Sequence, residues 1–569
     1  MVQQTQQAWD EECDVLVFGS GGGGMSAALF AARAGLQVMV CEKRQYLGGT
    51  TATSGGGIWV PGTPGGLAAG DTIERAREYL RWELGDHYRS DIIDAFLAQG
   101  AGIVETLNTQ TDVKFELSSW PDYHSDEPGG AKKGRTLFPA PFDGKRLGRD
   151  FALLQPPMHR IMVLGGLMLG PDEVPDFLRP LSSVRAFRRV LRKLARYALD
   201  WLRFGRGTDL RSGNAMIASM MYSMPRDRVS LRTQHALVEL LKENGRVVGA
   251  VVQGSAGTRR IRARRAVVLA TGGFPHNKDM LRTYGPKFPH QQSLGCEANV
   301  GEGIKSALAV GASMDTDLNS VANWTPASVM RDRQGREIPV IYGYLDRGRP
   351  GVIAVDAKGR RFVNESSSYH DIVSAMFKHS GGEGTFHFVC DLAFVRRHGL
   401  GAVRPWPWTR SRAPFVRSGY LTMASTLPEL ARAIGADEAT LTETVQRHNA
   451  NCKTGVDVDF GRGATAYNRM FGHETGQPNP NLAPIGAPPY LALRIHAASL
   501  GTTIGLKTTA DAQVVGVDGQ PIDGLYACGN DLAAAFRGRY PGGGTTLGPA
   551  VVFGALAAQH IAKSARTAD

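Results

Sequence analysis

The sequence has few of the features that mark secreted, metal-binding or membrane-spanning proteins. Its 569 residues include only six cysteines, and none of them form a CxxC pair: Cys13, Cys41, Cys296, Cys390, Cys452 and Cys528. Such usage argues against a disulfide framework or a metal site and fits a reducing cytoplasm. The N-terminal MVQQTQQAWDEE lacks the basic and apolar regions of a secretory signal. No apolar run reaches about 18 residues, so the sequence predicts no membrane-spanning helix.

The positive charge is concentrated in one segment. The net charge is +12, and residues 183–206 hold eight Lys or Arg against Asp200 alone, which accounts for +7 of it. No nucleic-acid recognition motif accompanies this charge, so a nucleic-acid partner is not expected.

Residues 156–206 combine that charge with apolar side chains. A nine-residue apolar run at 161–169 is too short to span a bilayer. Apolar residues then fall on one face of a predicted helix, with arginines largely on the other: Val184, Phe187, Leu191, Leu194, Ala198 and Trp201. A basic amphipathic helix suits an anionic membrane surface, whereas the alternative is an ordinary surface helix packed on the core. We expect peripheral attachment to the inner, cytoplasmic face of a membrane.

A strand–turn–helix–strand unit occupies residues 14–43. The apolar run 15–18 is followed by Gly19-x-Gly21-x-x-Gly24, a helical pattern, a second β-branched run and Glu42. In such a unit Gly19 makes the tight turn, Gly21 lets the backbone approach a pyrophosphate, and the helix N-terminus favours its negative charge. Glu42 would accept hydrogen bonds from an adenosine ribose. The sequence therefore predicts a dinucleotide site.

Further glycine turns are spread along the whole chain, near residues 48, 271, 529 and 542. A nicotinamide enzyme needs one such turn, whereas a bound flavin dinucleotide touches many segments, so the predicted cofactor is FAD. The helix after Gly548 would direct its N-terminus at the flavin pyrimidine ring. No metal is predicted. The candidate cofactor-binding residues are Gly19, Ser20, Gly21, Gly22, Gly23, Gly24, Glu42, Lys43, Arg44, Gly49, Thr50, Thr51, Ser54, Gly55, Gly56, Thr271, Gly272, Gly529, Asn530 and Leu547.

The predicted fold is α/β, a Rossmann-like FAD-binding domain with an inserted α+β substrate or cap domain. Residues 10–280 and 490–569 would form the first domain, with 156–206 as an insertion. Residues 281–489, which are richer in Trp, Pro and loops, would form the cap.

Five stretches together resemble the fumarate reductase/3-ketosteroid dehydrogenase group of flavoproteins, and within it 3-ketosteroid Δ1-dehydrogenases. They are GSGGGG, GGTTATSGG, RFVNESSSY, DGLYACGN and YPGGGTTLGPA, and WPDYH at 120–124 is a further specific match. The resemblance covers nearly the whole chain except 156–206. The family pattern usually reads YPGPG, and Gly543 stands here in place of the second proline.

The resemblance implies an active site for 1,2-dehydrogenation of an apolar 3-ketosteroid. Tyr540 and the backbone N–H of Gly544 would bind the C3 ketone as an oxyanion hole. Tyr369 would take the proton from C2, flavin N5 would take the hydride from C1, and Tyr123 would support Tyr369. Such support is needed because the reference pKa of tyrosine is about 10.

Three alternatives stay open on the sequence. A Δ4-(5α) dehydrogenase differs only in which carbons lie over N5. A fumarate-type reductase would require an arginine as the general acid, and Arg361 stands in a plausible place. The pair of ketone-binding groups at Tyr540 and Gly544 argues against a dicarboxylate substrate. A non-enzymatic, membrane-bound flavin sensor would need no such pair. The electron acceptor that reoxidises the flavin is not identified by the sequence.

Overall fold

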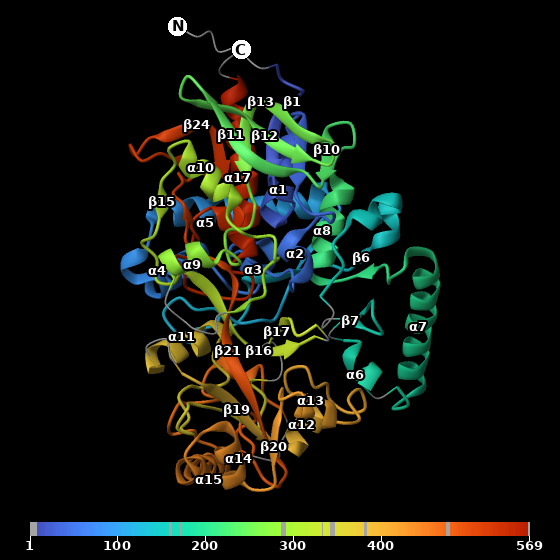
Figure 1. The fold of residues 1–569 in the computed structure, drawn as a ribbon, viewed down its shortest axis with the longest axis vertical. Coiled ribbons are helices and arrows are strands. Elements are labelled where there is room, and N and C mark those ends of the chain that lie inside the picture. The colour runs from blue at the N-terminus through green and yellow to red at the C-terminus, as the bar shows by residue number, and fades with distance from the viewer. Residues whose placement is uncertain are drawn as a thin grey trace.

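The computed structural model describes residues 8–158, 162–170, 172–178, 180–285, 292–332, 334–341, 347–380, 384–473 and 478–566. Two bodies lie one above the other along the longest axis, and the long helix α7 (Val184–Phe204) stands at the side (Figure 1). The upper body holds β1 and α17, from opposite ends of the sequence, and the lower body holds the middle of the chain.

The upper body is built on the predicted unit at 14–43. Strand β1 (Glu11–Phe18), helix α1 (Gly22–Arg33) and strand β2 (Val38–Glu42) follow the expected order, and β1 and β2 pair in parallel from Val15↔Val38 to Phe18↔Cys41. Residues 15–18 of β1 and the whole of β2 are buried, because helices cover this sheet, as is usual for parallel sheets. The main path of the sheet runs β10-β2-β1-β13-β12-β11, and β24 joins β13 in parallel. The remaining bounds are β10 Val229–Thr233, β11 Ala236–Glu243, β12 Arg246–Gly254, β13 Gly257–Leu269, β23 Gln513–Val515 and β24 Pro521–Ala527.

Helix α17 (Leu547–Arg566) brings the end of the chain against α1. Ser26 Oγ donates to the carbonyl of Val551 at 2.7 Å, and a Cβ on Gly554 would stand 2.4 Å from the carbonyl oxygen of Gly23. At the turn itself, a Cβ on Gly24 would stand 2.1 Å from the oxygen of Gly19. The glycine at position 24 is therefore required for close packing of the turn against the helix.

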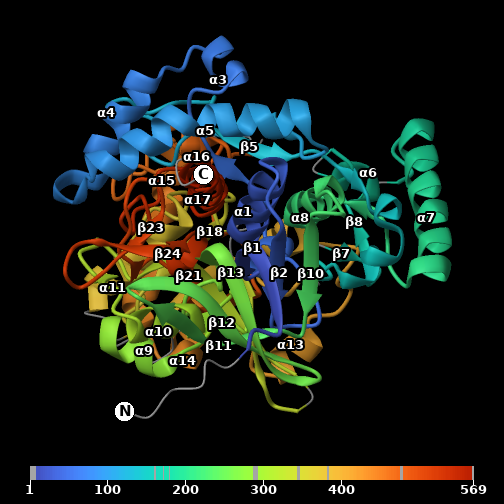
Figure 2. The same ribbon diagram turned by 90° about the horizontal axis from the view of Figure 1, so that it is seen from above.

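Shorter elements surround this core. Figure 2 shows α4 and α5 along one edge of the upper body, with α8 beside α1. The helices are α2 Gly49–Thr53, α3 Pro64–Ala68, α4 Ile73–Leu84, α5 Ser90–Gln110, α8 Ser212–Ser223, α9 Lys278–Tyr284 and α10 Glu302–Ala309. The small strands are β3 Ile58–Trp59, β4 Phe115–Leu117, β5 Thr136–Pro139, β6 Phe142–Asp143, β9 Asp209–Leu210, β15 Met314–Asp315 and β22 Gly505–Leu506.

The lower body holds most of the range predicted as the cap, 281–489, although α10 and β15 of that range lie with the upper body. Its sheet runs β17-β16-β21-β19-β18, with β14 and β20 also paired to β21. The long strand β21 (Tyr490–Thr502) begins at the predicted boundary at 489/490 but lies in the cap sheet, and the chain rejoins the upper sheet at β23 and β24. The other strands are β14 Gln292–Ser293, β16 Ala322–Arg331, β17 Glu337–Ile341, β18 Val352–Val355, β19 Phe386–Asp391 and β20 Thr422–Ala424. The helices are α11 Tyr369–Ser380, α12 Leu392–His398, α13 Ala413–Arg417, α14 Leu427–Ile434, α15 Glu438–Thr454 and α16 Ala466–Arg469.

The segment 156–206 contains a small hairpin and two helices, and it has a small core of its own. The apolar run forms β7 (Met162–Val163) and β8 (Leu167–Met168), followed by α6 (Val174–Leu178) and α7. Buried Leu167, Phe177 and Val190 pack together there. The buried Nζ of Lys193 is 2.9 Å from Glu173, which fixes the inner side of α7. Among the helices described, none has the length and apolar character to cross a bilayer.

The apolar side chains predicted on one face of α7 lie largely in solvent. Val184 is 75% exposed, Leu191 55% and Trp201 57%, while the buried positions are Ala186, Val190, Lys193 and Asp200. Most of the predicted apolar stripe therefore faces away from the protein, and Leu194 is the exception, because it packs on the small core of this segment.

Candidate functional site

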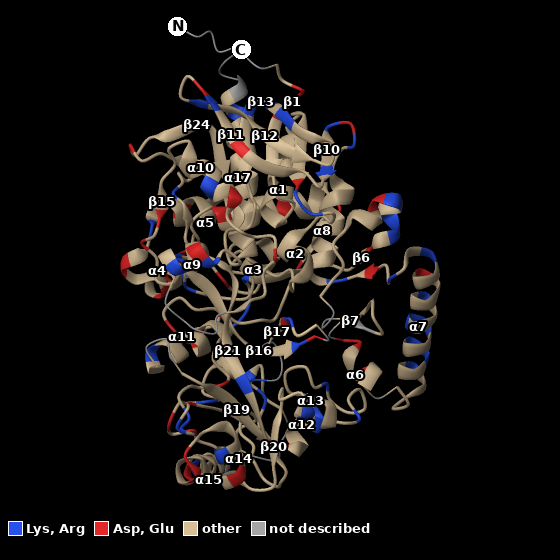
Figure 3. Ribbon diagram, viewed as in Figure 1, with Lys and Arg blue, Asp and Glu red and all other residues tan. Residues whose placement is uncertain are grey.

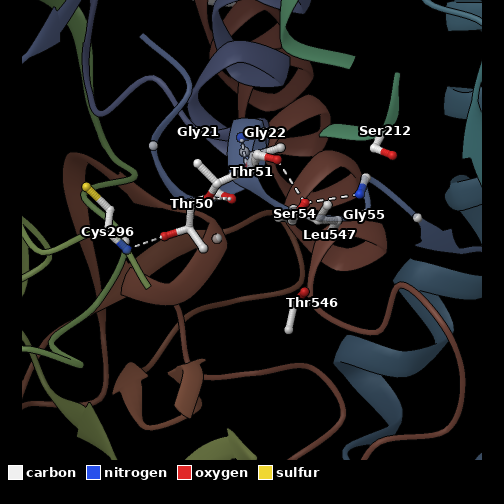
Figure 4. A pocket seen from close by; sticks show the side chains of 18 of the residues that line it. Gly21, Gly22, Thr50, Thr51, Ser54, Gly55, Ser212, Cys296, Thr546 and Leu547 are labelled. Atoms are coloured by element: carbon white, nitrogen blue, oxygen red, sulfur yellow. Dashed lines mark hydrogen bonds between the residues drawn. The ribbon is translucent and has the colours of Figure 1, made fainter. Parts of the chain in front are cut away.

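One continuous cavity of about 850 Å³ lies between the upper body and the cap. It starts at the turn after β1, passes the segment 49–57, and ends at the loop before α17 and the strand β17 of the cap. In Figure 4, Gly21 and Gly22, the threonines 50 and 51, and Thr546 with Leu547 come from three separate segments around this space.

The carboxyl ends of the parallel strands form one half of the cavity. Glu42, at the end of β2, has one carboxylate oxygen 2.6 Å from Ser20 Oγ, while its other oxygen accepts from the backbone N–H of Arg44 at 3.0 Å. Thr51 Oγ1 accepts from the N–H of Gly22 at 3.0 Å, and Thr50 Oγ1 accepts from the N–H of Cys296 at 2.8 Å (Figure 4). The Thr51 bond holds α2 against the N-terminus of α1, and the Thr50 bond joins α2 to the segment at residue 296.

The chemistry of this half suits FAD. The N-terminus of α1 and the glycines before it form a site for the pyrophosphate. Glu302 lines the same region, and its Oε2 is buried without a hydrogen-bond partner among the described residues. Such an acceptor suits a hydroxyl or amino donor of an adenosine group. Among the residues described here, no three His, Cys, Asp or Glu side chains are arranged to hold a metal ion.

Nearly all the predicted cofactor residues line the cavity. They are Gly19, Ser20, Gly21, Gly22, Gly23, Glu42, Lys43, Gly49, Thr50, Thr51, Ser54, Gly55, Gly56, Thr271, Gly272, Gly529, Asn530 and Leu547. Two do not. Gly24 lies behind the turn, and Arg44 points its guanidinium at the sulfur of Cys296, 3.1 Å away.

The other half of the cavity is largely apolar. Its walls include Trp120, Phe138, Pro139, Pro141, Met158, Leu169, Leu294, Ile341 and Leu500. The one Arg on the described lining, Arg211, lies 3.4 Å from Glu173 and 3.6 Å from Asp209, so its charge is compensated within the protein. This half suits a neutral, apolar molecule.

A cluster of buried tyrosines adjoins this apolar half. Tyr540 and Gly544 line the cavity, whereas Tyr123 and Tyr369 pack against Tyr540 and are not among the lining residues. The Tyr540 ring stacks on Tyr123 at 5.5 Å and meets Tyr369 edge-on at 5.0 Å. The Tyr123 hydroxyl donates to the Tyr369 oxygen at 2.9 Å. The structure thus brings together the four residues to which the resemblance assigned catalytic roles, and those roles stay predictions.

Two members of the cluster were not expected from the sequence. Tyr467 packs on Tyr123 at 4.6 Å between ring centroids, and its hydroxyl accepts from Arg347 Nη2 at 3.2 Å. The fully buried Arg347 also lies 5.9 Å from the Tyr369 ring and donates to the carbonyls of residues 365 and 367. No local pattern marks either residue, because they meet the site only through the packing of the cap.

The polar residues behind this cluster are tightly bonded. Asp122, next to Tyr123, is buried and accepts from Trp59 Nε1 at 2.8 Å and from Arg135 at 2.7 Å. Glu365 of the RFVNE stretch lies between Arg361, at 2.9 Å, and Arg462, at 3.1 Å. Burial opposes its ionisation, but the two guanidinium groups and the Ala354 N–H keep the pKa of Glu365 below its usual value.

Comparisons with known proteins agree with this site. The profile of the family described as FAD binding domain matches residues 14–547. The chain is 40% identical to 4-oxocyclohex-2-ene-1-carboxylate 5-dehydrogenase of Sinomonas cyclohexanicum, over 97% of this chain and 94% of the relative. It is 36% identical to 3-oxosteroid 1-dehydrogenase of Mycobacterium tuberculosis, over 98% and 99%.

Two solved structures share the fold. The 3-ketosteroid Δ1-dehydrogenase of Sterolibacterium denitrificans, in complex with 1,4-androstadiene-3,17-dione, has a TM-score of 0.89 at 33% identity and covers 97% of this chain and 100% of that one. The 3-ketosteroid-Δ4-(5α)-dehydrogenase of Rhodococcus jostii has a TM-score of 0.65 at 23% identity, covering 98% and 99%, which shows the fold alone. The chain therefore belongs to the FAD binding domain family and is, within it, an FAD-dependent CH–CH oxidoreductase of the 3-ketosteroid dehydrogenase family.

Proposed function

We propose that the protein catalyses 1,2-dehydrogenation of 3-ketosteroids. The observation that carries this proposal is the position of the tyrosine pair at 2.9 Å beside an apolar, charge-compensated cavity. The proposal is also supported by the steroid dehydrogenases among the relatives of this protein and by the steroid-bound solved structure at 33% identity.

The strongest competing substrate class is a small oxocyclohexene carboxylate, since one relative at 40% identity is named for it. A carboxylate needs a cation to replace its hydration on binding. Arg211 is paired with Glu173 and Asp209, and Lys43 is paired with Glu302 at 2.5 Å in the cofactor half. Both cations among the described lining residues are thus paired with acids, and the buried Arg347 of the tyrosine cluster is not a lining residue and donates to backbone carbonyls and Tyr467, which favours a neutral ketone.

Each residue has a role that its position supports. Tyr540 and the N–H of Gly544 polarise the C3 ketone and so make the proton at C2 more acidic. The tyrosinate form of Tyr369 accepts that proton and becomes the neutral phenol, and the hydrogen bond that Tyr123 donates to the Tyr369 oxygen stabilises the ionised form before the transfer. FAD, when bound, supplies the acceptor for the hydride from C1. The apolar walls exclude water from the reacting carbons.

An anaerobic mixing experiment tests this assignment. We expect a 3-keto-4-ene steroid to bleach the flavin absorbance and to be converted to a 1,4-diene. Bleaching only by a saturated 5α-3-ketosteroid, with a 4-ene product, would instead identify a Δ4-(5α) dehydrogenase. Bleaching only by 4-oxocyclohex-2-ene-1-carboxylate would overturn the steroid assignment.

We further propose that α7 docks the enzyme on the cytoplasmic face of an anionic membrane. Its exposed apolar stripe is flanked by arginines, and Lys and Arg are prominent along α7 in Figure 3. A second basic stretch adjoins it in the cap: residues 392–428 contain six Arg and no Asp or Glu, and Trp406 there is 64% exposed. Arg404 of this stretch donates to the carbonyl of Met162 at 3.1 Å, which connects it to the segment 156–206. Apolar steroids partition into lipid, so docking would place the enzyme at its substrate.

Point substitutions test the membrane proposal better than deletion, because Met158 and Leu169 of this segment also line the cavity. The triple variant Phe187→Ser/Leu191→Ser/Trp201→Ser should lose at least about 10-fold in partitioning onto phosphatidylglycerol-rich vesicles, because each buried apolar side chain contributes about 1.5–3 kcal/mol. Sedimentation measures the bound fraction. A matched control replaces three exposed valines elsewhere, Val238, Val458 and Val517, by Ser and should pellet like the wild type. Equal pelleting of the two variants would contradict docking through α7.

A further inference from the structure

His124 lies between two acidic side chains that come from the two bodies of the protein. Its Nδ1 is 2.7 Å from the Oε2 of Glu83, near the end of α4. Its Nε2 is 3.1 Å from the Oδ2 of Asp371, in the first turn of the cap helix α11. Both ring nitrogens face a carboxylate oxygen, so both must donate and the ring must be an imidazolium.

The charge of this group is favoured by its surroundings. Burial on its own would lower the pKa of His124, but Asp371 and Glu83 raise it to about 11. In return, His124 and the Ser368 hydroxyl, which is 2.7 Å from Asp371, hold the pKa of that buried carboxyl well below its usual range. The bridge is therefore charged throughout the neutral range of pH.

The bridge lies directly beside the tyrosine pair. His124 follows Tyr123 in the sequence, and Asp371 lies in the first turn of the helix that begins with Tyr369. The backbone N–H of Tyr123 also donates to the carbonyl of Pro541 at 3.0 Å, next to Tyr540. One short segment thus joins the upper body, the ketone-binding loop and the cap helix.

We propose that His124 is a positioning residue: by joining Glu83 to Asp371 it fixes the Tyr123 hydroxyl on the Tyr369 oxygen. This inference rests on the proposed role of Tyr369. A hydrogen bond between side chains of two separate bodies is lost when either body shifts by about 1 Å, and a misplacement of that size can cost about 100-fold in rate. Both ring nitrogens of His124 are bonded to carboxylates, so His124 acts on the tyrosines through the bridge.

The test is single-turnover flavin reduction by a saturating 3-keto-4-ene steroid, with wild type, His124→Ala, Asp371→Asn and the double variant. We expect His124→Ala to reduce its flavin about 10- to 100-fold more slowly, with the steroid dissociation constant within about 3-fold of wild type and FAD content unchanged. The double variant should be no slower than the slower single variant, because both changes break one bridge. In a Tyr369→Phe background, His124→Ala should have no further effect.

The inference would be overturned if His124→Ala reduced its flavin at the wild-type rate. It would also be overturned if the fold-decrease in rate of the double variant equalled the product of the two single fold-decreases. If His124→Ala does not retain FAD, His124→Gln, which is neutral and of similar reach, carries the same test. The wild type in the same experiment separates the two hypotheses. Failure of the wild type to bleach would overturn the proposed function, whereas normal bleaching by wild type and variant alike would overturn only the role of His124.

Discussion

Replacing Tyr369 by Phe should slow flavin reduction by a 3-ketosteroid by about 10²- to 10⁴-fold. This range is what a positioned general base contributes, and the substitution removes only the oxygen that would accept the C2 proton. The ring contact with Tyr540 is kept, so packing in the cluster should change little. FAD should remain bound, because Tyr369 belongs to the tyrosine cluster and not to the cofactor half of the cavity.

The measurement is the rate of flavin bleaching after anaerobic mixing, together with the ratio of flavin to protein. Tyr526→Phe is a suitable control, because this buried Tyr bonds His560 at 2.7 Å, away from the cavity. The control should reduce its flavin at close to the wild-type rate. Near-normal reduction by Tyr369→Phe would remove this residue as the base and leave the proton to another group.

Replacing Gly544 by Ala should destroy the ketone-binding loop. The φ angle of Gly544 is +101°, and an added Cβ would lie 2.4–2.6 Å from the backbone atoms of Gly57 and Ile58. The backbone conformation alone costs about 1–2 kcal/mol for a residue with a Cβ. The clash is with backbone atoms, which cannot rotate away, so residues 57 and 58 must shift and move the loop that carries Tyr540.

Gly529→Ala is the matched control for this effect. Gly529 also lines the cavity and has a positive φ of +64°, but nothing lies within 4 Å of its added Cβ. We expect Gly544→Ala to lose most of its FAD and to melt several degrees lower, while Gly529→Ala shows only the smaller conformational cost. Flavin content and thermal melting of purified protein measure both. Equal behaviour of the two variants would show that the close approach to residues 57 and 58 is not what requires glycine.

The sequence was sufficient to predict the cofactor half of the site. A dinucleotide is bound by one contiguous segment: the turn at residue 19, the helix after it and the acid at residue 42. Because this site is local in the chain, its residue spacing can be recognised in the sequence. The family profile confirms FAD as the cofactor, and the resemblance to the 3-ketosteroid dehydrogenase family is confirmed at that level. Overall similarity does not separate a steroid from a smaller cyclic ketone as substrate, because relatives named for each of the two match nearly the whole chain, at 36% and 40% identity.

The tertiary structure decided which distant side chains meet at the candidate site, and no local sequence pattern predicts these contacts. Tyr123 and Tyr369 are 246 positions apart, and their contact depends on how the cap sheet lies on the upper body. For the same reason, Arg347 and Tyr467 join the cluster without any signal in their own neighbourhoods. Arg211 likewise meets Glu173 of the inserted segment through folding, in addition to its sequence neighbour Asp209.

The helix at 184–204 shows the same division. Its amphipathic pattern and its charge follow from the spacing of its residues, and the helix itself forms as predicted. Which side would face the protein could not be read from that pattern. The inner side is fixed by Val190, which packs on a small apolar core, and by the ion pair of Lys193 with Glu173, and this leaves Val184, Leu191 and Trp201 exposed. Local sequence therefore determined the elements and the cofactor chemistry, whereas long-range packing and buried charge pairs decided which side chains meet and which surface remains free.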